Sequence, residues 1–227
     1  MKKLYKRETF KSKEEWLNNR GFGGSSASAI LGCNPYITII DLYKSIVFGK
    51  AKKIDETNES MQYGTRCEPL IRELFKYDFE NKYKVHSPSH YEMFRRKDKS
   101  YLTATLDGII TDLSSGEKGI LEIKTHDIKN MKDAEYWSDY IPQNYYVQCL
   151  HYLVVMNDFS FVILCAKLRY FDYYDPNGKK ILRQEIRYYR LERKELEKEL
   201  NMLEKKETDF YENNVLKKIM PTLKIKF

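Results

Sequence analysis

Cysteine is scarce in this sequence, and the few cysteines are far apart. Four are spread over 227 residues without any CxxC pair, at Cys33, Cys67, Cys149 and Cys165. Such spacing predicts neither a disulfide framework nor a cysteine-built metal site, and it fits a reduced cytoplasmic protein. The class of small, disulfide-rich secreted domains is therefore excluded.

Long apolar runs are absent as well. No stretch approaches the roughly 20 apolar residues that cross a bilayer, and the lysine-rich start has no apolar signal core. Glycine and proline are thinly spread, at 10 and 6 residues, and no long linker or internal repeat divides the chain. We therefore expect a single domain with no membrane partner.

The sequence does have a sizeable apolar fraction and an excess of positive charge. Apolar residues make up 42% of the chain, which is enough for one globular domain with its own core. Forty Lys and Arg against 33 Asp and Glu give a net charge of +7, which favours an anionic partner, most commonly nucleic acid. An AT-rich genome enriches Lys, Tyr, Asn and Ile and explains the same composition, so charge alone leaves both interpretations open.

The first 59 residues are expected to be mainly helical. Three short helices are predicted there: one over 13–19, one within the small-residue segment 23–32, and one over 38–48. The second lies in a run of small residues, with Ser25 or Ser26 as its N-cap and Gly32 at its end. The polar segment 50–59 is predicted to be a loop.

A longer helix is predicted from residue 60 onward. Its apolar residues follow the i, i+3, i+4 spacing of a buried stripe: Leu70, Ile71, Leu74 and Phe75. Pro69 would break a helix interior, so the helix either begins there or kinks there.

Strands and helices alternate in the rest of the chain. Two apolar runs, 103–111 and 119–125, flank a turn-forming segment and predict a β-hairpin. The later elements are expected as a helix over 145–155, strands over 159–166 and 181–189, and a charged helix over 192–211. Leu196, Leu200 and Leu203 share one face of that last helix, which we expect to pack against a sheet rather than form a coiled coil. This order predicts an α/β or α+β domain with a central sheet flanked by helices.

Two acidic residues and a lysine fall on the predicted hairpin. Side chains alternate along a strand, so Glu122 and Lys124 share one face while Ile123 points into the core. With the turn midway between the two runs, Asp107 lies within about two positions of facing Glu122 or Lys124. Two carboxylates and a lysine are therefore expected at one end of a sheet.

Converging carboxylates indicate a divalent metal. Like charges raise each other's pKa unless a cation lies between them, and Mg²⁺ prefers carboxylate oxygens. A lysine beside such a metal can stabilise or deprotonate the attacking water in phosphodiester hydrolysis. The alternative is an ordinary hairpin with a surface ion pair.

Three further residues fit the same site. Glu68 lies on the helix before the sheet, where a third carboxylate reaches the metal, although a helix surface charge is the plainer interpretation. Gln148 lies on the next helix, where a capping or core amide is the alternative. Arg20 precedes the small-residue segment and is placed to meet a phosphate with backbone N–H groups; a solvated arginine is the alternative.

Histidines and clustered aromatic residues give weaker evidence about function. The four histidines, His86, His90, His126 and His151, have no ligand spacing, so no zinc site is expected. His126 is expected at the surface or against DNA, and His151 is expected to support the helix of Gln148. The aromatic segment 170–174 either stacks on bases or packs within the protein.

Taken in order, these motifs resemble the phage lambda exonuclease family, the YqaJ-type viral recombinase branch of the PD-(D/E)XK nucleases. The matching segments are Arg20 with Gly23-Gly24-Ser25, Leu31 to Tyr36, Met61 to Pro69, Leu106-Asp107-Gly108, Leu121 to Lys124, and Pro142 through Tyr145, Gln148 and His151. Leu106 stands where the superfamily's name places a proline, a departure that many relatives share.

The resemblance implies a restriction-endonuclease-like core, with a central mixed β-sheet flanked by helices, and a role for each motif residue. Four groups would bind metal: the carboxylates of Glu68, Asp107 and Glu122 and the backbone carbonyl of Ile123. Lys124 would orient or activate the nucleophilic water, and Gln148 would lie near the metal and the scissile phosphate. Arg20 and Ser25 would hold the 5′-terminal phosphate of the DNA.

The function that the resemblance implies is a metal-dependent exonuclease. It would digest the 5′ strand of linear duplex DNA to mononucleotides and leave a 3′ single strand for an annealing protein. Mg²⁺ would be the cofactor, with two ions per site and Mn²⁺ able to substitute. A homo-oligomeric ring and a phage or prophage origin in the bacterial cytoplasm are implied as well.

The single domain 1–227 is expected to have three parts. Residues 1–59 would bind the 5′ end, 60–167 would form the catalytic core, and 168–227 would add a hairpin and a helix. Two alternatives stay open: an endonuclease of the same fold, since fold does not fix the mode of cleavage, and a non-catalytic DNA-binding module.

Overall fold

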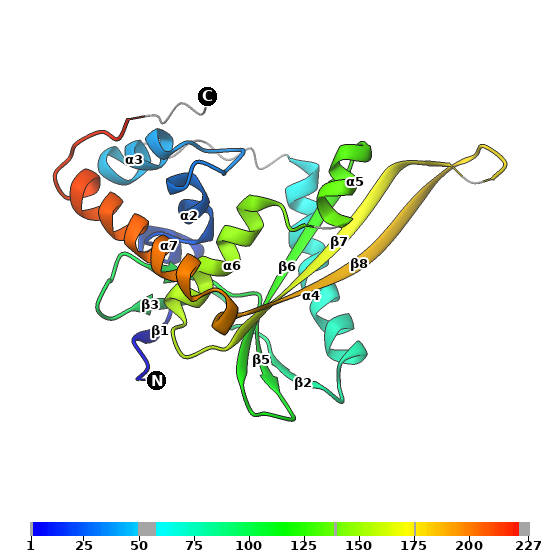
Figure 1. The fold of residues 1–227 in the computed structure, drawn as a ribbon, viewed down its shortest axis with the longest axis horizontal. Coiled ribbons are helices and arrows are strands. Elements are labelled where there is room, and N and C mark those ends of the chain that lie inside the picture. Colours follow the sequence, from blue (N-terminus) through cyan, green and yellow to red (C-terminus); the bar gives the residue numbers. More distant parts are fainter. Residues whose placement is uncertain (1, 50–57, 139, 175, 223–227) are drawn as a thin grey trace.

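The computed structural model describes residues 2–49, 58–138, 140–174 and 176–222. Its centre is a five-stranded mixed sheet of order β2-β5-β6-β7-β8, beside a three-stranded sheet of order β1-β3-β4 (Figure 1). The strands are β1 (Tyr5–Thr9), β2 (Tyr83–His86), β3 (Glu92–Arg96), β4 (Thr103–Ala104), β5 (Gly108–Asp112), β6 (Lys118–Ile128), β7 (Phe161–Tyr174) and β8 (Lys180–Glu192).

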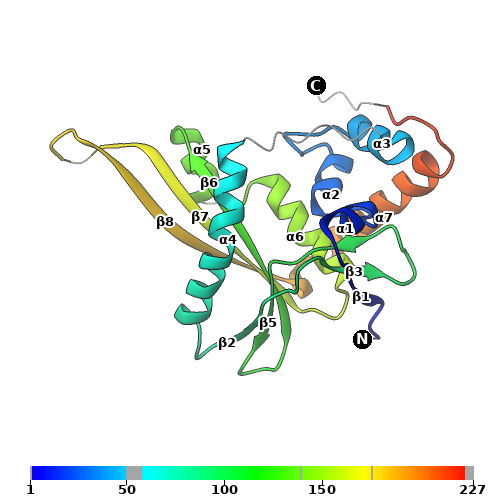
Figure 2. The ribbon, with the colours of Figure 1, turned by 180° about the vertical axis from the view of Figure 1, so that it is seen from behind.

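Helices cover both faces of the five-stranded sheet. α4 lies on one face and α6 on the other, as the opposite views in Figures 1 and 2 show. The helices are α1 (Lys13–Asn18), α2 (Gly24–Ile30), α3 (Ile39–Phe48), α4 (Glu59–Asp78), α5 (Met131–Ser138), α6 (Gln143–Val155) and α7 (Glu197–Phe210), with a 3₁₀ turn at Arg193–Glu195 and a π turn at Tyr211–Val215. The predicted architecture, a central mixed sheet flanked by helices, is confirmed. No helix in the described part of the chain has the length and apolar character that a membrane crossing needs.

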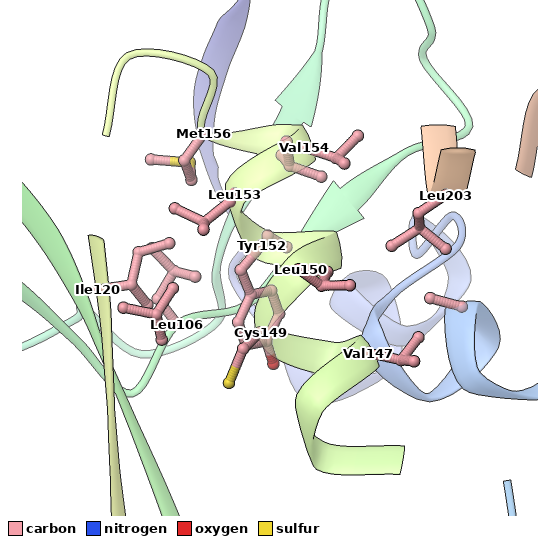
Figure 3. Packing of buried hydrophobic residues seen from close by; sticks show 14 of the residues in the cluster. Leu106, Ile120, Val147, Cys149, Leu150, Tyr152, Leu153, Val154, Met156 and Leu203 are labelled. Atoms are coloured by element: carbon pink, nitrogen blue, oxygen red, sulfur yellow. The ribbon is translucent and has the colours of Figure 1, made fainter. Parts of the chain in front are cut away.

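Each face of the sheet has its own core. On the α6 side, Ile120 packs with Leu150 and Leu153 (Figure 3). On the α4 side, the next strand residue, Leu121, packs with Phe75. Because neighbouring residues of β6 point to opposite faces, one strand supplies both cores.

The N-terminal helices largely follow the prediction. The helices over 13–19 and 38–48 are confirmed as α1 and α3. Thr38 caps α3: its hydroxyl accepts from Asp41 N at 3.1 Å, and the Asp41 carboxylate accepts from Thr38 N at 2.9 Å. The predicted loop over 50–59 falls mostly on residues 50–57, which lie outside the described residues.

The start of α2 differs from the prediction. Its N-cap is Gly23 rather than Ser25 or Ser26. The chain is extended up to Phe22, which bridges to Leu102, so the helix begins as soon as that pairing ends. Its predicted end is confirmed, since α2 stops at Ile30 and Gly32 adopts a left-handed φ of 72°.

In α4 only half of the predicted stripe is buried. Ile71 and Phe75 pack into the core, but Leu70 is 69% exposed and Leu74 is 42% exposed. The buried face of this helix holds Ile71, Arg72 and Phe75, and the row of Leu70 and Leu74 faces away from the sheet. Pro69 lies inside the helix, so the expectation that the helix begins there is wrong.

The predicted hairpin exists, but its first strand is shorter. Residues 103–104 form β4 of the small sheet, and only residues 108–112 pair with β6 as β5. β7 and β8 are longer than predicted and form a hairpin that projects from the body of the molecule (Figures 1 and 2). Strands β1, β2 and β3 and helix α5 were not predicted.

The C-terminal helix packs differently from the expectation. α7 begins at Glu197 after the 3₁₀ turn, and Leu196, Leu200 and Leu203 are buried as predicted. They join the core around α6 and α2, and Figure 3 shows Leu203 beside α6. The stripe therefore packs against helices rather than directly against the sheet.

Candidate active site

The register of β5 and β6 brings the two acidic residues together. Gly108 pairs with Leu121 in this antiparallel ladder, so Asp107, one residue earlier, stands opposite Glu122. The backbone N–H of Ile123 donates to Asp107 Oδ2 at 2.7 Å, and the two carboxyls are close enough for the charge of Asp107 to act on Glu122. The predicted pairing within two positions is confirmed.

Glu122 is the buried centre of the cluster. It is 1% exposed, and its Oε1 atom accepts from Lys124 Nζ and from Gln148 Nε2, the latter at 2.7 Å. Its Oε2 atom is buried and has no hydrogen-bond partner in the described part of the chain. One oxygen of this carboxylate thus accepts hydrogen bonds from the protein, and the other is open to a partner from outside the described residues.

Burial and charge perturb the acid–base properties here. Desolvation, followed by the neighbouring Asp107 carboxyl, raises the pKa of Glu122 to about 8, although Lys124 opposes the shift. Burial acts to lower the pKa of Lys124, but Glu122 and Asp107 outweigh it and raise that pKa, so the lysine stays protonated. Two carboxyls that repel each other in a dry site are stabilised by added positive charge.

Glu68 reaches the cluster from α4 on the other side of the sheet. Its carboxylate forms an ion pair with Arg72, one turn further along the helix. Arg72 is buried and also donates through Nε to the backbone carbonyl of Asp107 at 2.5 Å. Burial and the nearby Asp107 raise the pKa of Glu68, while Arg72 and Lys124 act to lower it.

Arg72 was missed by the sequence reasoning. It connects the helix residue Glu68 to the strand end that carries Asp107, and so it fixes the spacing between them. Its i, i+4 relation to Glu68 was the available signal, because such a pair faces the same way on a helix. That signal alone does not show that the arginine is buried.

The donor set fits a hard divalent cation. The unpartnered Glu122 Oε2 lies beside the Asp107 carboxyl, and carboxylate oxygens are what Mg²⁺ prefers. Among the described residues, no three His, Cys, Asp or Glu side chains converge closely enough to bind a metal by themselves. Full coordination would thus draw on the Ile123 carbonyl, on water, or on Glu68 turning away from Arg72.

The segment around Arg20 packs directly against Gln148. A Cβ atom built on Gly24 would lie 2.2 Å from Gln148 Cγ, so only glycine fits there. Arg20 is exposed, with its guanidinium 4.7 Å from the centre of the Trp16 ring and its Nη2 atom 3.6 Å from where a Cβ atom of Gly23 would lie. The exposed Ser25 side chain makes no hydrogen bond to other described residues. The structure thus brings the predicted phosphate-binding residues to the border of the acidic cluster.

His151 is located as expected, whereas His126 is more buried than the surface position predicted for it. His151 is buried, with Nδ1 2.6 Å from Glu207 Oε1 and Nε2 2.8 Å from the carbonyl oxygen of Thr103. It fastens α6 to α7 and β4, which is the supporting role predicted for it. His126 is half-buried against Trp137.

Comparisons with known proteins find a matching family model and a related sequence. The family model described as the YqaJ-like viral recombinase domain matches residues 15–158. The uncharacterized protein YqaJ of Bacillus subtilis is 32% identical over 147 residues, which are 64% of this chain. The match covers 43% of that protein, so this chain spans less than half of the relative's length.

Solved exonuclease structures share the fold. An alkaline exonuclease from Laribacter hongkongensis superposes with a TM-score of 0.51 at 17% identity, over 91% of this chain and 100% of that chain. The same exonuclease in complex with dAMP gives 0.53 at 17% identity, over 90% and 99%. A phage-related exonuclease from Haemophilus somnus gives 0.52 at 16% identity, over 89% and 98%. Identities this low establish a common fold and no more.

Proposed function

The chain belongs to the YqaJ-like viral recombinase domain family, and on this premise we propose that it is a metal-dependent deoxyribonuclease. The proposed reaction is exonucleolytic: the 5′ strand of linear duplex DNA is hydrolysed to mononucleotides, and a 3′ single strand remains. The fold shared with exonucleases from Laribacter hongkongensis and Haemophilus somnus supports this choice.

The observation that carries the proposal is the unpartnered Oε2 atom of Glu122. A buried carboxylate oxygen without a donor costs free energy unless a cation or a donor completes it. Beside it lie a second carboxyl and a protonated lysine. Mg²⁺ bound there would polarise the scissile phosphate and lower the pKa of a water molecule.

The chain's own residues take separate roles in this proposal. Asp107 and Glu122 bind the metal, with Glu68 and the carbonyl of Ile123 completing the set. Lys124 is held by Glu122 and orients the nucleophilic water through its charged amine. Two Mg²⁺ ions per site, with Mn²⁺ able to replace them, are part of the proposal.

Arg20, Ser25 and Gln148 are proposed to position the DNA. Gln148 keeps one amide N–H on Glu122 and lies next to the scissile phosphate. Arg20 can offer two parallel N–H donors to a terminal phosphate, which carries more negative charge than an internal diester. Ser25 adds a hydroxyl at the same border.

The proposed assembly is a homo-oligomeric ring that works with a single-strand annealing protein in a bacterial cell carrying the phage or prophage. Residues 1–59 would form the 5′-end-binding part, 60–167 the catalytic core and 168–227 the C-terminal hairpin and helix. A ring suits a 27.2 kDa chain because one copy has little surface with which to enclose a duplex.

The test compares 5′-phosphorylated linear duplex with a closed circle of the same sequence, with Mg²⁺ and with chelator. We expect mononucleotide release from the linear substrate only, and only with the metal. Cutting of the circle would point to an endonuclease. Metal-independent binding without any cleavage would contradict the enzyme proposal and favour a DNA-binding module.

A further inference from the structure

Tyr152 is a residue of the site that none of the sequence motifs singled out. It lies on α6 one turn after Gln148, is 5% exposed, and is among the buried residues of α6 in Figure 3. Its hydroxyl oxygen accepts a hydrogen bond from Gln148 Nε2 at 2.6 Å. A buried tyrosine hydroxyl normally finds a partner, and here that partner is a proposed active-site amide.

The hydrogen bonds of Gln148 fix the plane of its amide group. One N–H reaches Glu122 Oε1 at 2.7 Å and the other reaches the Tyr152 hydroxyl. Both hydrogens of the amide nitrogen are therefore used. Rotating the amide by half a turn would set its oxygen against the carboxylate of Glu122, so the carboxylate selects this orientation.

The stem of Gln148 is confined from the opposite side. The site of a Cβ atom on Gly24 is 2.2 Å from Gln148 Cγ and 3.0 Å from its Cβ, so the side chain already fills that space. It cannot swing toward α2. The Tyr152 hydroxyl and the bare backbone of Gly24 together leave the side chain one position.

We propose that Tyr152 is a positioning residue of the nuclease site, which acts by holding the Gln148 amide against Glu122. The inference rests on the proposed nuclease function. The hydrogen bond sets which atoms of Gln148 face the substrate: both N–H groups are occupied, and the amide oxygen is the group left to accept a hydrogen bond from the nucleophilic water. Tyr152 itself needs no contact with the DNA.

The test removes the hydroxyl and keeps the ring, in Tyr152→Phe. Loss of one hydrogen bond that orients a reacting group should lower kcat by roughly tenfold, with KM for DNA and Tm unchanged. In a Gln148→Ala background the same substitution should have no further effect, because the residue it acts through is gone.

The matched control is Tyr211→Phe. Tyr211 lies outside the proposed DNA-binding part and catalytic core, is half-buried against the ring of Tyr101, and its hydroxyl makes no hydrogen bond to another described residue. Its kcat should equal that of the wild type. A second variant, Gly24→Ala, displaces Gln148 from the other side and should reproduce the loss of kcat, again without further effect when Gln148 is absent.

A readout independent of cleavage is the NMR signal of the Gln148 side-chain amide in metal-free, ¹⁵N-labelled protein. Tyr152→Phe should move this signal toward the position of free glutamine, and Tyr211→Phe should not. An unmoved signal, or an equal loss of kcat with and without Gln148, would overturn the inference. If wild-type protein cleaves no DNA, the proposed function fails, and the amide signal still decides whether Tyr152 orients Gln148.

Discussion

Helices α4 and α6 flank the same sheet and each sends one polar side chain to the same cluster, but they are held very differently. Eight of the 13 residues of α6 are buried, against three of the 20 in α4. α6 lies between the sheet and the helices α2 and α7, whereas α4 has the sheet on one side only. One helix is part of the interior and the other is a cover.

The two side chains that these helices add to the candidate site differ in the same way. Gln148 on α6 is confined by Tyr152, Glu122 and Gly24, which belong to three separate segments of the chain. Glu68 on α4 is held by Arg72 of its own helix, and its side chain is 37% exposed. Glu68 can therefore leave its partner without disturbing the core, and Gln148 cannot.

The largest effect on cleavage is expected from substitutions in the acidic cluster, to which both helices add a side chain. Asp107→Ala, Glu122→Ala and Lys124→Ala should each lower cleavage by about 10³-fold or more, because they act as one unit. The fold should stay intact, as circular dichroism can verify. Near-wild-type turnover of a folded Glu122→Ala protein would contradict the site.

Neighbouring residues on α4 test whether the row of Leu70 and Leu74 lies outside the core. Phe75→Ala should lower the free energy of unfolding by about 3–5 kcal/mol, since a fully buried ring leaves a cavity. Leu74→Ala, one residue earlier and largely exposed, should cost less than about 1 kcal/mol. Urea titrations of the two variants measure both values; similar losses would mean that the Leu74 row is covered as well.

Metal dependence should separate Glu68 from Gln148. Glu68→Ala removes an adaptable ligand, so we expect activity to return at roughly 10- to 100-fold higher Mg²⁺. Gln148→Ala should lower kcat by roughly 10²-fold at every Mg²⁺ concentration, because it removes the oriented amide that positions the nucleophilic water. If high Mg²⁺ restored the activity of both variants, or of neither, the expected difference between Glu68 and Gln148 would be contradicted.

The smallest effect concerns the anchoring of α6 by His151. Burial acts to lower the pKa of His151, but the Glu207 carboxylate and the Thr103 carbonyl raise it above 6.5 on balance. A raised folded-state pKa gives stabilisation that is complete below pH 6.5 and is lost as pH rises through the folded-state value. The stability advantage of wild type over Glu207→Gln should shrink with rising pH above about pH 6.5.

That comparison needs only urea titrations of the two proteins across the same pH series. If the difference in unfolding free energy between wild type and Glu207→Gln stays constant with pH, His151 is not the positively charged partner of Glu207.

The sequence predicted contacts between residues close together in the chain, but it did not predict contacts between distant segments. The Asp107–Glu122 pairing is local to a hairpin, and strand periodicity placed it correctly. Leu70 and Leu74 were assigned to the core because periodicity shows an apolar row but not which row the sheet covers. The roles of Arg72 and Gly24 depend on segments far apart in sequence, and no local pattern reports such contacts.

The parallel pairing of β6 with β7 has a consequence for how the protein folds. Gly119 pairs with Phe161, 42 residues later, whereas Gly108 pairs with Leu121 across a short turn. Local hairpins close quickly, and parallel pairs must first pay the entropy of closing a long loop. Gln148 lies within that loop. We therefore expect the acidic pair to form early in folding and to stay inactive until the crossover has docked, so that a chain still emerging from the ribosome carries the carboxylates without the means to cut DNA.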